Sequence, residues 1–186
     1  MSKKVNIFWF RRDLRLDDNI GLNEALNNKL EVIPLFIFDE NITDELDKDD
    51  PRVNFIYKQL ESINSTLSTK YNSKLLVLKG NPFKVIQKLI TDYNIGEVFS
   101  NHDYEPYAIA RDKKITEFLS SKNIQFSSFK DQVIFEKAEI TKEDKTPYVV
   151  YTPYMKKWKT KLDSTNLSDF KSKDVTHNFY SKNDSL

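Results

Sequence analysis

The chain has 186 residues, a formal net charge of +1 and no Cys. The length suits one domain of ordinary size, and so small a net charge provides no global field to attract nucleic acid. The lack of Cys excludes disulfides and thiolate chemistry, and only three glycines, Gly21, Gly80 and Gly96, are too few for a dinucleotide fingerprint or a P-loop.

Short apolar runs rich in β-branched and aromatic residues predict five buried strands, over 5–10, 30–38, 75–78, 97–101 and 124–129. Between them, helices are predicted over 19–28, from Pro51, from Pro82 and over 105–122, because apolar residues recur there every three or four positions. Continuous apolar strands alternating with helices indicate a parallel sheet covered on both faces. We therefore predict a single α/β domain with a doubly wound, Rossmann-like, five-stranded parallel sheet.

The pattern divides the chain into three parts. The α/β domain is predicted over residues 1–135, an exit segment that packs on it over 136–165, and a linker-like tail rich in Ser, Lys, Asp and Asn over 166–186. Inside the domain, the stretch 39–50 holds seven acids against one Lys and is expected to be a solvated loop. The apolar run before Arg11 is too short for a signal peptide or a membrane span, and we expect a cytoplasmic protein.

The stretch FWFRRDLRLDDN, at the end of the first strand, crowds three Arg and three Asp into the positions from Arg11 to Asp18. Ligands bind beyond the carboxyl ends of the strands in a doubly wound sheet, so this cluster would lie at a binding edge. It could be an anion or ligand site. It could equally be a brace of Arg–carboxylate pairs, which the residues by themselves favour slightly.

Other chemistry is weakly supported. His102 and His177 are the only histidines, and Asp39, His102 and Asp103 show no ligand-like spacing, so no metal site is predicted. Ser100 lies in a predicted strand without the glycines of a nucleophile elbow. The sequence offers no candidate catalytic acid, base or nucleophile.

Three motifs carry a family resemblance. FWFRRDLRLDDN with IGLNEAL, then NHDYEPYAIARD at 101–112, then PYVVYTPYMKKW at 147–158, resemble the signatures of the DNA photolyase/cryptochrome family in order and approximate spacing. The resemblance covers about residues 4–165. It implies the family's N-terminal α/β domain, which can hold a light-collecting antenna chromophore. The catalytic FAD and most contacts to damaged DNA would belong to a C-terminal helical domain that is absent here.

The resemblance also implies site residues and a chromophore. Members of the folate-binding type have an Asn–Glu pair where this chain has Tyr107–Ala108, which disfavours methenyltetrahydrofolate. An 8-hydroxy-deazaflavin or a flavin is expected instead, although some members carry no antenna. By resemblance, the ring would lie near Phe36, Ile37, Phe38 and Asp39, with Arg52 as a cation, Asp103 at the ring edge, small Ala108 leaving room, and Arg11 undecided between ligand and brace.

Each of these residues also has a purely structural interpretation. Phe36 and Phe38 could be core residues, Asp103 could cap the following helix, and Arg52 could pair with the acidic loop. Three functions stay open: the antenna domain of a photolyase that serves repair of pyrimidine dimers, the same domain of a cryptochrome photosensor, or an unrelated nucleotide-binding module. The first is favoured. We expect a monomer without membrane contact that cannot repair DNA by itself and needs the FAD domain as a partner.

Overall fold

The computed structural model describes residues 3–47, 49–165 and 178–181. It divides into two compact units, the first formed by residues 1–131 and 170–186 and the second by residues 132–169. The strands of the first unit are β1 (Lys4–Phe10), β2 (Val32–Asp39), β3 (Leu76–Gly80), β4 (Asn94–Asn101) and β5 (Gln125–Phe129). Its helices are α1 (Ile20–Asn27), α2 (Glu40–Thr43), α3 (Pro51–Lys70), α4 (Pro82–Asp92) and α5 (Pro106–Ser121).

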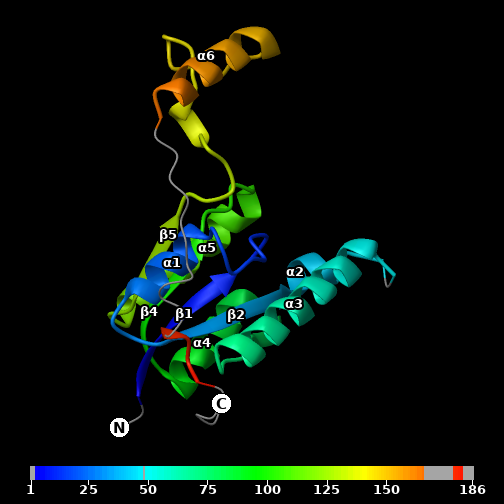
Figure 1. The fold of residues 1–186 in the computed structure, drawn as a ribbon, viewed down its shortest axis with the longest axis vertical. Coiled ribbons are helices and arrows are strands. Elements are labelled where there is room, and N and C mark those ends of the chain that lie inside the picture. The colour runs from blue at the N-terminus through cyan, green and yellow to red at the C-terminus, as the bar shows by residue number, and fades with distance from the viewer. Residues whose placement is uncertain (1–2, 48, 166–177, 182–186) are drawn as a thin grey trace. The chain divides into compact units, whose positions relative to one another are not determined.

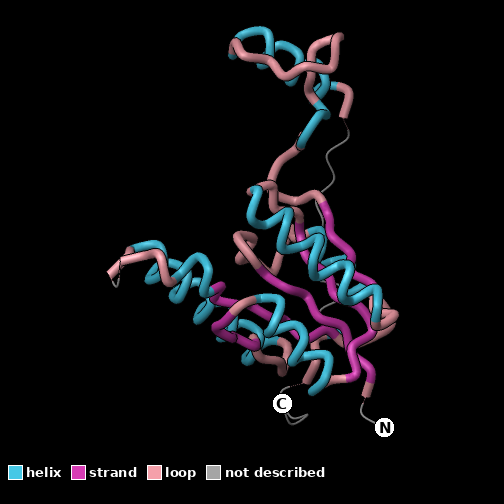
Figure 2. The backbone as a smooth tube through the Cα atoms, turned by 180° about the vertical axis from the view of Figure 1, so that it is seen from behind, coloured by secondary structure: helices cyan, strands magenta, loops and turns pink. Residues whose placement is uncertain are grey.

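The five strands form one parallel sheet in the order β3-β2-β1-β4-β5, which confirms the predicted fold class. The direction of winding reverses between β1 and β4, because β2 and β3 follow on one side of β1 whereas β4 and β5 follow on the other. The sheet and the helices on its two sides can be followed in Figures 1 and 2. This reversal creates the crevice in which doubly wound proteins bind ligands.

Two apolar cores, one on each face, hold the helices to the sheet. Alternate side chains of β1 enter different cores, with Phe8 and Phe10 in the first and Ile7 and Trp9 in the second. The first core also receives side chains of α1 and α3, and the second receives those of α4 and α5. Because both faces are covered, the central strands β1 and β2 have apolar residues at almost every position. The edge strands β3 and β5 were also predicted to be buried, but they are only partly so.

Most of the helices begin as the sequence indicates. Pro51, Pro82 and Pro106 stand in the first turns of α3, α4 and α5, where a missing N–H costs little. The acidic stretch after β2 is not entirely loop, because its first residues form α2. Asp39 caps this short helix by accepting a hydrogen bond from the Asn41 N–H.

A short segment of the predicted linker-like tail packs into the first core. Phe179 is 4% exposed, lies 5.6 Å from the ring of Tyr71 and forms a parallel bridge with Val32. The Tyr180 N–H donates a 2.9 Å hydrogen bond to the Val32 carbonyl. Residues 178–181 are therefore structural rather than linker, whereas 166–177 and 182–186 lie outside the described residues.

The second unit contains a short 3-10 helix, η1 (Lys137–Glu139), and helix α6 (Tyr151–Asp163). Within it, Trp158 packs edge to face against Phe135 at 5.5 Å, and the Lys161 ammonium lies 4.8 Å from the same Phe135 ring. The predicted boundaries at 135 and 165 stay predictions. No helix in the described part of the chain has the length and apolar character to cross a membrane.

Candidate functional site: a cleft at the carboxyl edge of the sheet

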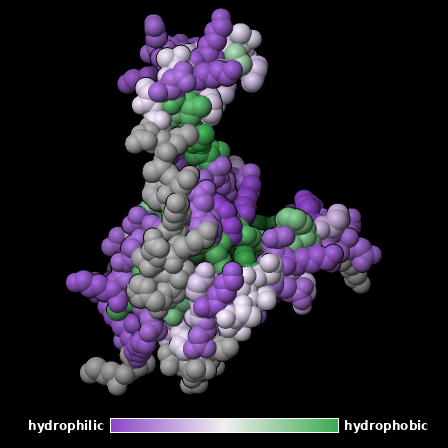
Figure 3. Space-filling model, in the orientation of Figure 1, coloured by the Kyte–Doolittle hydropathy of each residue, from purple (hydrophilic) through white to green (hydrophobic). Residues whose placement is uncertain are grey.

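A cleft of about 240 Å³ opens at the carboxyl ends of β1 and β2. Its walls come from the ends of both strands, from α2 and α3, from the loop after β4 and from α5. Rings and aliphatic chains of Trp9, Phe36, Phe38 and Ile42 meet the charged groups of Arg12 and Asp103 there. In Figure 3, apolar surface is visible beside α2 and the start of α3. The cleft thus has the mixture of apolar walls and few polar groups that is typical of ligand sites.

The charged cluster after β1 is largely a brace. Arg11 makes a bidentate pair with Asp112 of α5, with nitrogen–oxygen distances of 2.7 and 2.9 Å, and donates to the Asn101 carbonyl. Asp13 is 4% exposed and accepts hydrogen bonds from the Arg11 N–H and from the side-chain amides of Asn19 and Asn101. These bonds tie the ends of β1 and β4 to α1 and α5, and so fix the floor of the cleft.

Two buried guanidinium groups lie close to the Trp9 ring. The Arg11 Cζ is 4.3 Å and the Arg111 Cζ 4.8 Å from a Trp9 ring centroid, which is the range of cation–π contacts. Burial lowers the pKa of Arg11 below its ordinary value, and the nearby Asp112 carboxylate opposes that shift. Asp112 also accepts from the Arg111 Nε at 3.0 Å, so one carboxylate serves both arginines.

Asp39 is held by neighbours rather than left open to a ligand. Its Oδ1 accepts from the backbone N–H and the side-chain amide of Asn41, and its Oδ2 accepts from the Tyr107 hydroxyl at 2.6 Å. Arg111 Nη1 lies 3.8 Å from the same Oδ2. Burial, followed by the hydrogen bond to Asp39, raises the pKa of Tyr107 to about 12. This network joins α2 to α5 and positions one wall of the cleft.

Asp103 and Arg12 make fewer hydrogen bonds inside the protein than Asp39 and Arg11 do. The Asp103 side chain is 9% exposed and accepts a 3.3 Å hydrogen bond from the Glu105 N–H, but it does not cap α5, because the N-cap residue of that helix is Glu105 and no side chain caps it. The Arg12 side chain is 57% exposed, and its Nη2 lies 3.6 Å from Asp103 and 3.4 Å from Glu105. Neither contact of Arg12 is a direct hydrogen bond, so this guanidinium keeps donors for a ligand.

The structure brings together most of the residues predicted for the site. Six of them line the cleft: Arg11, Phe36, Ile37, Phe38, Asp39 and Asp103. Arg52 does not, because its guanidinium makes three hydrogen bonds to Asp50, at 2.6 to 3.1 Å, and its side chain is 71% exposed. Ala108 is 1% exposed in the interior and is not among the lining residues.

Sequence reasoning missed three residues of the site. Trp9 and Arg111 were not among the predicted site residues, yet both line the cleft. Tyr107 was considered only because it stands where folate-binding members have Asn, whereas in the structure its hydroxyl donates a hydrogen bond to Asp39 and orients that carboxylate. The available signal was the position of Tyr107 and Arg111 four residues apart in α5, which places them on one face of the helix.

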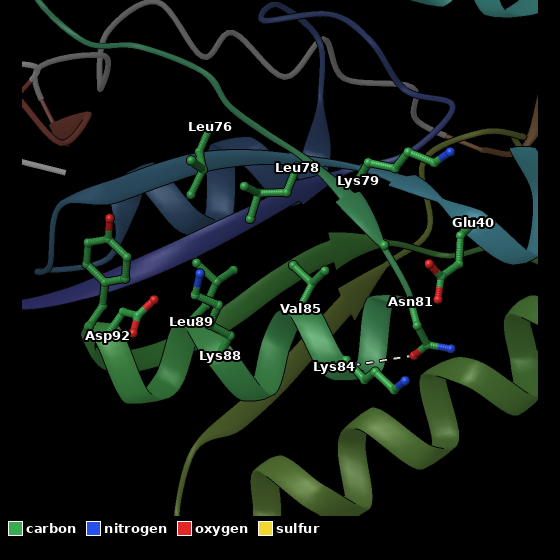
Figure 4. Close-up of a pocket in the computed structure, with 12 residues that line it drawn as sticks. Glu40, Leu76, Leu78, Lys79, Asn81, Lys84, Val85, Lys88, Leu89 and Asp92 are labelled. Atoms are coloured by element: carbon green, nitrogen blue, oxygen red, sulfur yellow. Dashed lines mark hydrogen bonds between the residues drawn. The ribbon is translucent and has the colours of Figure 1, made fainter.

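A second cavity, of about 430 Å³, lies between the edge strand β3 and helix α4. Figure 4 shows Leu76 and Leu78 of β3 above Val85 and Leu89 of α4. Lys84 and Asp92 stand on its rim, and the Asn81 side chain accepts hydrogen bonds from the first turn of α4. None of the predicted site residues lines this groove, so the cleft at the carboxyl edge remains the candidate site.

The fold and the cleft together define a doubly wound α/β domain with a largely apolar cleft at the carboxyl edge of its sheet. The family model for DNA photolyase matches residues 6–173. The chain therefore belongs to the DNA photolyase family, and it corresponds to the N-terminal α/β domain of that family.

Relatives and solved structures agree with this assignment. A deoxyribodipyrimidine photo-lyase of Synechococcus sp. is 33% identical over 86% of the chain, and the chain spans 33% of that protein's length. A class III photolyase structure from Agrobacterium tumefaciens matches with a TM-score of 0.75 and 26% identity, covering 89% of this chain and 33% of that one. A Sulfolobus tokodaii photolyase structure, described as containing two FAD molecules, has a TM-score of 0.62 and 32% identity, covering 73% and 32%.

Proposed function

We propose that this domain binds a light-harvesting chromophore, a flavin or deazaflavin, in the cleft at the carboxyl edge of the sheet. The observation that carries the proposal is the position of that cleft beside the reversal of strand order, walled by Trp9, Phe36 and Phe38, in a chain of the DNA photolyase family. The Sulfolobus structure supports it, because that photolyase contains two FAD molecules, with the implication of a novel light-harvesting cofactor.

The residues of the cleft fit such a group. Flat rings suit apolar walls, and the Asp103 carboxylate can accept a hydrogen bond from a ring N–H, while Arg12 can donate to a ring carbonyl. A bound flavin or deazaflavin would supply absorption of blue light. The chain's own contribution is to hold the ring, exclude water and fix its orientation, which requires no acid, base or nucleophile.

The function of the whole assembly follows from the same proposal. The excitation would pass to an FAD held by a separate helical domain, and the assembly would serve the repair of pyrimidine dimers in DNA. Photolyase relatives favour repair, although cryptochromes are also among the matching proteins. The isolated domain, as a cytoplasmic monomer, would bind the chromophore without acting on DNA.

Titration of the purified chain tests this proposal directly. Riboflavin and 8-hydroxy-5-deazaflavin should each lose fluorescence on saturable binding, and methenyltetrahydrofolate should bind more weakly. Asp103→Asn should weaken ring binding, whereas Asp92→Asn, a matched change on the rim of the other cavity, should leave it unchanged. Equal effects of the two substitutions, or no saturable binding of either ring, would overturn the proposal.

A further inference from the structure

The edge strand β3 has one side of its main chain open. Among the strands that the structure describes, β3 pairs with β2 alone, because the sheet order places it at the end. An edge strand presents a row of N–H and C=O groups that can pair with another strand. The cavity of about 430 Å³ between β3 and α4 lies beside these groups. Together they form a groove, called the β3 groove below, which shares no lining residue with the cleft.

Side chains of β3 make this edge of the sheet apolar on both faces. On the face covered by α4, Leu76 and Leu78 lie opposite Val85 and Leu89, as Figure 4 shows. On the face covered by α3, Val77 is 42% exposed, since successive side chains of a strand point to opposite faces. An added strand could therefore bury apolar side chains above and below the sheet.

An aromatic side chain of α3 extends the apolar surface on the side of Val77. The Asn64 side chain accepts a 2.9 Å hydrogen bond from the Leu75 N–H, so this face of α3 is turned toward the start of β3. Tyr57 stands about two helical turns before Asn64 and so lies on the same face. Its side chain is 57% exposed. It stands ready to cover a side chain of an added strand.

The rim of the β3 groove carries lysines that favour an acidic partner. Lys84 and Lys88 stand one turn apart on α4 and are exposed, and neither forms an ion pair with any residue that the structure describes. The third lysine of the rim, Lys79, pairs with Asp44 at 3.0 Å. A second copy of the chain would bring the same lysines to the groove, so charge repulsion opposes self-pairing.

The chain itself uses strand addition next to β3. The pairing of β2 with β3 begins at Leu35, and before that point Phe179 forms its parallel bridge with Val32. Phe179 enters the first core, whereas Tyr180 packs against the second. Successive side chains of one extended segment thus cover the two faces of the sheet, which is the arrangement that a strand added to β3 would adopt.

We infer that the β3 groove binds an extended, acidic peptide segment of a partner protein, which adds to β3 as a sixth strand. Main-chain hydrogen bonds to β3 provide affinity in this mode, and side chains in the groove provide specificity. Apolar side chains of the segment lie over Leu76 and Leu78, and a carboxylate lies at Lys84 and Lys88. The site is separate from the cleft, so the inference does not depend on a bound chromophore.

Fluorescence anisotropy with a labelled hexapeptide, TLTETL, tests the inference. Its Leu and Glu side chains share one face of a strand. The peptide should bind the purified chain saturably, and about fivefold more tightly than TLTKTL, in which Lys replaces Glu. Lys84→Glu/Lys88→Glu should reverse this preference. Lys113→Glu/Lys122→Glu, the matched change of two exposed lysines outside the groove, should preserve it.

Hydrogen exchange of the saturated complex shows whether the peptide adds as a strand. Amides of residues 76–80 should exchange at least about tenfold more slowly with TLTETL bound, because hydrogen bonding protects them. Unchanged exchange there, equal affinity for the two peptides, or no saturable binding would refute the inference. So would loss of the preference in the Lys113→Glu/Lys122→Glu control. A dimer of the unaltered chain in sedimentation, dissociated by the peptide, would assign the edge to a second copy instead.

Discussion

Phe179→Ala should strongly destabilise the first unit, although Phe179 stands in a polar stretch of the sequence whose composition is typical of a linker. The side chain is 4% exposed, contacts the Tyr71 ring and lies where the chain pairs with Val32. Truncation of a buried Phe to Ala costs about 3–5 kcal/mol in general. We expect about 3 kcal/mol here, at the low end of the range, because the short segment around Phe179 can relax toward the space it leaves.

Urea unfolding followed by far-ultraviolet circular dichroism measures this cost. With a slope of about 2 kcal/mol per molar urea, the midpoint should fall by about 1.5 M. Tyr57→Ala is the matched control, because Tyr57 is a 57% exposed aromatic residue on α3 and its loss should change stability by less than about 0.5 kcal/mol. If Phe179→Ala costs less than about 1 kcal/mol, the segment does not contribute to the core and the reasoning from its burial is refuted.

Two further predictions concern the charged network. Asp112→Asn removes the carboxylate from Arg11, whose side chain is 6% exposed, and should cost about 3–5 kcal/mol in urea unfolding; a cost below about 1 kcal/mol would contradict a buried pair. Because the pKa of Tyr107 is raised to about 12, the fold favours the protonated phenol, so its contribution to stability is complete below its ordinary pKa of 10.0 and is lost as pH rises toward 12. Thermal unfolding across this window should show a smaller pH-dependent loss for Tyr107→Phe than for the unaltered chain, and parallel losses would argue against the Asp39 hydrogen bond.

The architecture could be predicted because each of its elements is encoded locally. Strands buried on both faces require continuous apolar runs, and Pro51, Pro82 and Pro106 stand at helix starts. The parallel order then brings the ends of β1, β2 and β4 to one edge. Asp39 and Asp103 could therefore be placed near one another from the strand order, whereas Phe36 was placed there by the family resemblance, and all three line the same cleft.

The rest of the site depends on contacts between side chains that no local pattern reveals. Arg52 was expected at the cleft, but Asp50, two residues earlier, captures its guanidinium. Arg11 and Asp112 are 101 positions apart, so their pairing follows only from the packing of α5 against the end of β1. Phe179 lies in a polar stretch with few apolar neighbours, and nothing in its periodicity indicated that it enters the core.

The position of Trp9 gives the protein a built-in optical reporter. The chain contains two tryptophans, and Trp158 belongs to the second unit, whereas Trp9 forms part of the wall of the cleft. A Trp158→Phe chain would thus emit ultraviolet fluorescence from a single indole in the wall of the cleft. Quenching of this indole would register the binding of a light-absorbing ligand in the cleft, without any attached dye.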